Sequence, residues 1–288
     1  MNKEITTFVE FWQAIKQIQC AEDEILLFRG HPDKKYLLLP GAFHDKAKNA
    51  EMNQYHDIMI EYPEEFQQRS HLSNLVKMQH YGVATRLLDF SRNPLVASFF
   101  ASELSSRGAM DIRNEADGEV VIVRIKKSEI LHHNSDRALM LSCLPCFSDA
   151  DQKELKEFCD SHRGRISEQY VQAYDSAIHR LLHEIRGEYP GFACEMIGED
   201  LLNGFFVAPF KDNERMKLQN GLFYIFGLNR EELDHRLDVI RIVVNKNAKK
   251  EILHDLKLMN ISNSHLYSGF ERAAMNIRNK RAEWSEIS

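Results

Sequence analysis

The sequence predicts an α+β fold for this chain of 288 residues. Short apolar runs typical of buried strands occur before residue 126 and again after residue 204, among amphipathic segments with helical spacing. The two kinds of element do not alternate strictly, which argues against a parallel α/β sheet. We therefore expect one domain over residues 1–288, with core motifs at about 20–126 and 204–280 and a helical insertion at about 136–190.

Caps mark the helix boundaries in the first third of the chain. Thr7 and Glu10 match the capping-box spacing, and apolar residues then recur on one helical face. Gly82 suits the C-terminal end of a helix. Asn93 as N-cap and Pro94 at the first helical position start a nearly all-apolar, and hence central, helix. The helices expected here cover about 8–18, 51–68, 71–80 and 94–104.

Apolar runs rich in β-branched and aromatic residues predict the strands. The clearest is 119–125, which is almost entirely Val and Ile. The other predicted strands cover 24–28, 204–208, 222–226 and 239–244. Amphipathic spacing predicts two more helices, over 248–259 and 270–280.

The composition fits a globular protein: 43% of the residues are hydrophobic and 28% are charged. A net charge of −6 argues against a protein that coats nucleic acid, although local contact with an acceptor strand stays open. No apolar run is long enough to cross a bilayer, so no membrane partner is expected. The first residues lack an apolar signal segment, which favours a cytoplasmic location.

The five cysteines are expected to be reduced thiols, because their number is odd and no export signal accompanies them. Cys143-x2-Cys146 followed by Cys159-x2-His162 has a spacing that a zinc site can use. The apolar neighbours of the first pair, and the amphipathic helix expected around Cys159, favour packing instead. We assign no metal ligand on this spacing.

Residues 79–93 concentrate polar side chains in a glycine-containing segment that we expect to be a loop. His80, Tyr81, Thr85, Arg86 and Asp89 all lie within it. The segment precedes the N-terminus of the helix that starts at Pro94, and helix N-termini attract anions. It is either one side of a ligand pocket or a buried polar network that fixes the loop, in which Arg86 pairs with Asp89.

Two further clusters carry the same ambiguity. Arg29 ends a buried strand, where a guanidinium can bind a phosphate or a carboxylate, and Gly30 allows close approach of a ligand or of backbone. The alternative is a structural Arg–Asp pair beside a turn. Arg215 and Gln219 share one side of a short predicted helix and could complete an anion and amide pocket, or simply belong to a capped helix–turn–strand unit.

The motifs of P-loop ATPases, Rossmann dehydrogenases, serine hydrolases and HExxH zinc proteases do not occur in the chain. What does occur is Phe28-Arg29-Gly30, then QHYG at 79–82, TRLLD at 85–89, Pro94 and FFA at 99–101. These motifs resemble the FRG domain family. A later block, N-x-R-x-x-x-Q-x-G-x-F at 213–223, and the tail at 252–271 resemble the downstream part of that family.

The organisation of the FRG family resembles that of the ADP-ribosyltransferases, which bind NAD on a central split sheet of mixed or antiparallel strands. The resemblance implies that the catalytic residues are Arg29, His80, Tyr81 and Glu271. It implies that NAD is contacted by Arg29, Gly30, Tyr81, Thr85, Arg86, Asp89, Arg215 and Gln219. Transferases usually end this block in a catalytic Glu, which the Gln219 position does not supply, so Glu271 or Glu195 would have to provide it.

We therefore expect an NAD-dependent ADP-ribosyltransferase-like toxin, plausible in antiphage defence, that modifies a nucleic acid or a protein. An antitoxin or chaperone partner would keep such a toxin silent. Two alternatives stay open: a non-catalytic module that senses a nucleotide through the same pocket, and a metal-dependent nuclease that uses Asp89 with distant carboxylates.

Overall fold

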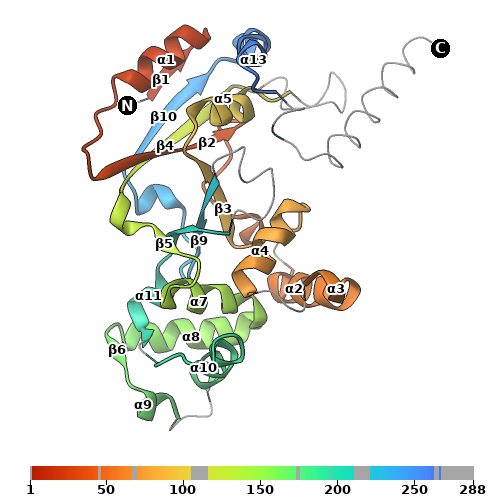
Figure 1. Ribbon diagram of the computed structural model, residues 1–288, viewed down its shortest axis with the longest axis vertical. Helices are drawn as coiled ribbons and strands as arrows, with labels where there is room; N and C mark the ends of the chain where they lie inside the picture. The colour runs from red at the N-terminus through yellow and green to blue at the C-terminus, as the bar shows by residue number, and fades with distance from the viewer. Residues whose placement is uncertain are drawn as a thin grey trace, which may run out of the picture.

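The structure is a computed structural model that describes residues 2–44, 47–66, 70–104, 116–172, 176–194, 196–210, 221–262 and 266. Helices and strands are mixed along the chain, as expected for α+β (Figure 1). The first half contains β1 (Asn2–Ile5), α1 (Phe8–Lys16), β2 (Glu24–His31), η1 (Gly41–Phe43), α2 (Ala50–Glu61), α3 (Pro63–Phe66), α4 (His71–His80), β3 (Leu87–Ser91), α5 (Pro94–Ser102), β4 (Gly118–Lys126), η2 (Lys127–Glu129) and β5 (Leu131–His132).

The second half begins with helices and returns to strands. Its elements are α7 (Asp136–Cys143), η3 (Leu144–Cys146), α8 (Asp149–Ser161), β6 (Arg165–Ile166), α9 (Glu168–Gln172), α10 (Ala177–Glu188), β7 (Met196–Ile197), α11 (Gly198–Leu202), β8 (Phe205–Ala208), β9 (Gly221–Ile225), η4 (Leu233–His235), β10 (Val239–Val244), η5 (Lys246–Ala248) and α13 (Lys249–Leu258).

The main sheet has eight strands in the order β1-β10-β4-β2-β3-β9-β8-β5. Its inner pairs are antiparallel, whereas β1 pairs with β10 and β5 with β8 in parallel, so the sheet is mixed. β2 and β3, at the middle of this order, are joined by a single registered pair, Phe28 with Ser91. The sheet therefore consists of two four-stranded halves that meet at one point.

Helices cover the two halves differently. The half that contains β4 packs its Ile and Val side chains against α1, α5 and α13, which lie at the same end of the molecule in Figure 1. The other half borders a helical core made by α2, α4, α7, α8 and α10. β4 is buried on both faces from Gly118 to Val123, which explains its nearly unbroken apolar sequence.

The N-caps predicted from sequence are present, although the Glu10 carboxylate of the predicted capping box accepts mainly from the backbone N–H of Thr6, the residue before the N-cap. Thr7 accepts a hydrogen bond from the backbone N–H of Glu10, and Asn93 accepts one from Leu95 with Pro94 in the first turn of α5. Gly82 has a φ of 84°, the left-handed conformation that ends α4. The predicted strands correspond to β2, β4, β8, β9 and β10.

Three expectations need correction. Residues 87–91, expected to lie in a loop, form strand β3, because they pair along their full length with β9 and this long-range pairing outweighs their local polarity. The helix expected over 51–68 ends at Glu61, since Tyr62 precedes Pro63 and cannot continue the helix. The insertion expected to be helical at about 136–190 contains several short helices, with the short strand β6 between α8 and α9.

Within the described residues, no helix combines the length and apolarity needed to cross a membrane. The predicted helix over 270–280 lies outside them.

Candidate functional site

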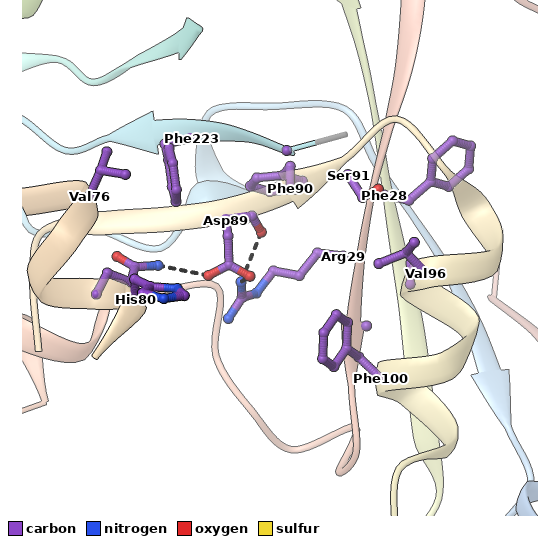
Figure 2. Close-up of a pocket in the computed structure, with 14 residues that line it drawn as sticks. Phe28, Arg29, Val76, His80, Asp89, Phe90, Ser91, Val96, Phe100 and Phe223 are labelled. Atoms are coloured by element: carbon purple, nitrogen blue, oxygen red, sulfur yellow. Dashed lines mark hydrogen bonds and ion pairs between the residues drawn. The ribbon is translucent and has the colours of Figure 1, made fainter. Parts of the chain in front are cut away.

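A pocket lies where the two halves of the sheet diverge, and its cavity volume is about 200 Å³. Strand β2, strand β3, the end of α4 and the start of α5 all contribute to it (Figure 2). The described residues that line it are Phe28, Arg29, Gly30, Val76, Gln79, His80, Asp89, Phe90, Ser91, Val96, Ala97, Phe100, Gly221 and Phe223. Arg29 and the 79–91 segment, which are distant in sequence, thus line one cavity.

Arg29 bridges the divergence between β2 and β3. Beyond the Phe28–Ser91 pair the two strands separate, and Arg29 Nη1 donates a hydrogen bond to the backbone carbonyl of Asp89 at 2.8 Å. The same nitrogen lies 3.0 Å from the Asp89 carboxylate. The Arg29 side chain therefore donates to a backbone carbonyl that would otherwise pair with a neighbouring strand. The same contact places a cation and an anion side by side in the cavity.

Gln79 holds the Asp89 carboxylate from the other side. Its Nε2 donates to Asp89 Oδ1 at 2.8 Å, and its Oε1 accepts from Thr85 Oγ1 at 2.5 Å. Thr85 is buried and its hydroxyl also accepts the backbone N–H of Leu87. Thr85, expected to contact the ligand, therefore orients Gln79, which in turn positions Asp89.

His31 supports Arg29 from behind. Arg29 Nε donates to His31 Nε2 at 2.9 Å, and His31 Nδ1 lies 3.0 Å from Glu119 Oε1. Because Nε2 accepts a hydrogen bond, the ring is neutral and Nδ1–H donates to Glu119. Burial lowers the pKa of His31, and the positive charge of Arg29 acts in the same direction against the hydrogen bond to Glu119.

A second arginine, Arg241, pairs with the buried carboxylate of Glu119. Arg241 on β10 donates to Glu119 and, at 2.6 Å, to Asp234. Glu119 is 2% exposed, so the paired guanidinium is what makes its negative charge tolerable there. A continuous polar chain thus runs from the sheet interior to the tip of Arg29.

The apolar part of the pocket comes from α5 and β9. Phe100 and Phe223 line it and stand on different sides of Arg29 in Figure 2. Gly30 allows α5 to pack directly on β2, because a Cβ at that position would lie 2.0 Å from the carbonyl oxygen of Ala97. Gly30 was expected to allow close approach either of a ligand or of backbone. The structure supports the second role, because the α5 backbone lies against Gly30.

His80 and Tyr81 are placed differently from one another. His80 is the last residue of α4 and lines the pocket next to Arg29 (Figure 2). Tyr81 is 63% exposed and does not belong to the lining, although its ring packs edge-on against His80 at 5.1 Å between centroids.

Arg86 does not reach the pocket, which corrects its expected contact with NAD and its expected pairing with Asp89. It is fully buried and binds both carboxylate oxygens of Glu51, at 2.8 and 2.6 Å. It also donates to Gln152 and to the carbonyl of Phe226. The side chain of Arg86 therefore ties α2, α8 and the end of β9 together.

The remaining predicted residues, Arg215, Gln219 and Glu271, lie outside the described residues, as does Glu195. Conversely, Gln79, His31 and Glu119 hold the geometry of the site although the sequence predicted no role for them. For Gln79 the available signal is its place at the start of the QHYG motif. The His31–Glu119 contact joins residues 88 positions apart, and no local pattern marks it.

The arrangement can bind a ligand that combines an anion or hydroxyl groups with a planar ring. Arg29 offers donors, Asp89 offers acceptors and is 55% exposed, and the aromatic residues offer ring faces.

Comparison with known proteins identifies the part of the chain that supplies most of this pocket, all of its lining residues except Gly221 and Phe223. The family model of the FRG domain matches residues 24–109, a stretch that includes β2, α4, β3 and α5. The chain therefore carries an FRG domain. Neither the curated proteins nor the solved structures gave a match to this chain.

Proposed function

We propose that this FRG-domain protein is an ADP-ribosyltransferase that uses NAD as its substrate and binds it at the Arg29–Asp89 pocket. The observation that carries the proposal is the meeting of Arg29, Asp89 and His80 with aromatic side chains in one cavity at a split between two sheet halves. A cation, a carboxylate and ring faces are what a dinucleotide with a pyrophosphate, riboses and a nicotinamide requires.

Arg29 is the proposed contact of the NAD pyrophosphate. Its described contacts use Nε and Nη1. A guanidinium has five N–H donors, so those on Nη2 can take a phosphate oxygen while His31 keeps the side chain in place.

Asp89 is a further candidate, beside Glu271, for the carboxylate that the Gln219 position does not supply. It is the one carboxylate among the described lining residues. In the proposed reaction the bond between ribose C1′ and the nicotinamide nitrogen breaks, and its electron pair leaves with nicotinamide. The acceptor nucleophile attacks C1′ and loses its proton to a base, while a carboxylate near the 2′-hydroxyl stabilises the positive charge that develops on the ribose.

The cavity holds only part of NAD. A volume of about 200 Å³ is below the roughly 300–1,000 Å³ of typical small-molecule sites. We assign it to the nicotinamide riboside end with the adjoining phosphate. Glu271, Arg215 and Gln219 keep their proposed roles in completing the site. An antitoxin or chaperone as inhibitor and a nucleic acid or protein as acceptor complete the proposal of a toxin.

The test is transfer of label from adenylate-labelled NAD in a cell lysate, followed by separation of labelled protein from labelled nucleic acid. The wild-type chain should transfer label, and Arg29→Ala should not. Arg92→Ala is the matched control, because Arg92 is an exposed arginine next to the motif and outside the pocket lining. Stoichiometric NAD binding without nicotinamide release would instead identify a sensor, and chelator-sensitive cleavage of RNA or DNA would identify a nuclease.

A further inference from the structure

A second cluster of reactive side chains lies in the helical part, away from the Arg29 pocket. His71 begins α4, Cys146 ends η3 and Glu184 lies in α10. One potential ligand atom from each of these residues lies within 4.8 Å of the other two. No other group of three or more His, Cys, Asp or Glu side chains meets that condition among the described residues.

Contacts surround the His71 ring on both sides. Cys146 Sγ lies 3.6 Å from Nδ1, and Glu184 Oε1 lies 3.3 Å from Nε2. The Tyr55 hydroxyl lies 2.6 Å from Nδ1, and Glu188 Oε2 lies 3.9 Å from Nε2. If Nε2 binds the metal beside Glu184, the Tyr55 hydroxyl stays within hydrogen-bonding distance of Nδ1 and can fix the ring, as is usual for metal-binding histidines.

Negative charge gathers beside the His71 ring in a largely buried place. The carboxylates of Glu184 and Glu188 both face Nε2 of His71. The side chains of His71 and Glu188 are only 17% and 16% exposed. A cation beside these carboxylates would offset their charge where water does so poorly.

We propose that His71, Cys146 and Glu184 bind a Zn²⁺-class dication that joins α4, η3 and α10. A thiolate, an imidazole and a carboxylate are the ligand types that zinc accepts together, and hard cations such as Mg²⁺ do not favour the thiolate. Binding releases the proton of the Cys146 thiol to solvent, because the thiolate is the form that binds the metal. This site differs from the Cys3His spacing considered from the sequence: only Cys146 is common to both.

The proposed role is structural. α4 carries His71 at its start and Gln79 and His80 at its end, and a ten-residue helix transmits a fixed start to its other end over about 15 Å. A metal at His71 would therefore stabilise the element that supplies two residues of the pocket. The site itself does not depend on the function proposed for that pocket.

The experiment titrates the purified full-length chain, reduced and freed of metal, with Co²⁺ and then Zn²⁺. We expect one equivalent of Co²⁺ to produce a thiolate-to-cobalt charge-transfer band in the near ultraviolet, and one equivalent of Zn²⁺ to displace it. Since losing even an outer partner of a metal ligand costs about 10–100-fold in affinity, Cys146→Ser should abolish the band and weaken zinc binding at least tenfold. Glu184→Gln, at a position that is 41% exposed and tolerant of change, should weaken binding similarly.

Cys20→Ser is the matched control, because Cys20 is an exposed cysteine outside the cluster. It should bind as the wild type does. Circular dichroism of each variant establishes that it is folded. A folded wild-type chain that takes up no stoichiometric Co²⁺ or Zn²⁺ overturns the proposal, and so does a Cys146→Ser variant that keeps the band.

Discussion

Arg29 contacts Asp89 twice, through the backbone carbonyl at 2.8 Å and through the carboxylate at 3.0 Å. The contact forms where β2 and β3 separate after their one registered pair. The arginine side chain is therefore both a substitute for the missing strand contact and the cation of the pocket. Its two roles can be distinguished experimentally.

Replacing Arg29 by lysine should preserve the charge and lose the double contact, because an ammonium cannot form the planar fork of a guanidinium. Hydrogen bonds to charged groups contribute about 1.5–3 kcal/mol each, so NAD turnover should fall by about 10–100-fold. Initial rates of nicotinamide release measure this loss. Turnover by Arg29→Lys equal to that of the wild type would show that charge alone suffices.

Removing Arg86 should destabilise the fold rather than change the pocket chemistry. Breaking one partner of a buried ion pair costs about 3–5 kcal/mol, and Arg86 is fully buried against Glu51. Urea unfolding of Arg86→Ala should show this loss. The matched substitution at exposed Arg92 should stay within about 0.5 kcal/mol of the wild type. Similar midpoints for the two variants would contradict the structural role of Arg86.

Gly30→Ala should also destabilise the fold, because the new Cβ would lie 2.0 Å from the Ala97 carbonyl oxygen and 2.6 Å from the Ala101 nitrogen. Overpacking of this kind costs about 1–3 kcal/mol or more, since α5 must move away from β2. Gly164→Ala is the control, with no atom within 4 Å of its Cβ. Thermal unfolding of both variants compares them directly. Equal melting temperatures for the two variants would contradict the close packing of α5 on Gly30.

Protonation of His31 should lower the free energy of unfolding at mildly acidic pH. Its folded pKa is lowered from 6.5, chiefly by burial, so the unfolded chain binds the proton first as the pH falls. The stability contributed by neutral His31 is thus present above pH 6.5 and decreases below it, by at most about 1.4 kcal/mol per pH unit. His31→Gln keeps an acceptor and a donor without titrating, so its stability should fall less between pH 7.5 and 5.5. Parallel curves for the two proteins would contradict the buried neutral ring.

Local sequence signals predicted much of this structure. Asn93, Pro94 and Gly82 mark helix ends because caps act within a few residues, and the Val and Ile run of β4 marks a strand buried on both faces. The FRG motifs also predicted that Arg29 and Asp89 belong to one site.

Long-range contacts account for what the sequence did not indicate. Arg86 and Thr85 occur in the same motif as Asp89 yet are buried, because they precede β3 and bond to Glu51 and Gln79 of two neighbouring helices. The motif contains several polar residues, and its sequence does not indicate which of them are buried in the fold. His31, Glu119 and Arg241 come from three strands, and only the sheet order brings them together.

The most direct test of the central claim is calorimetric titration of NAD into the wild-type chain, Arg29→Ala and Arg92→Ala under identical conditions. The pocket described here predicts saturable binding by the wild type and by Arg92→Ala, and a loss of at least about tenfold in affinity for folded Arg29→Ala. Unchanged affinity in Arg29→Ala, with the fold intact by circular dichroism, would contradict the assignment of NAD to this pocket.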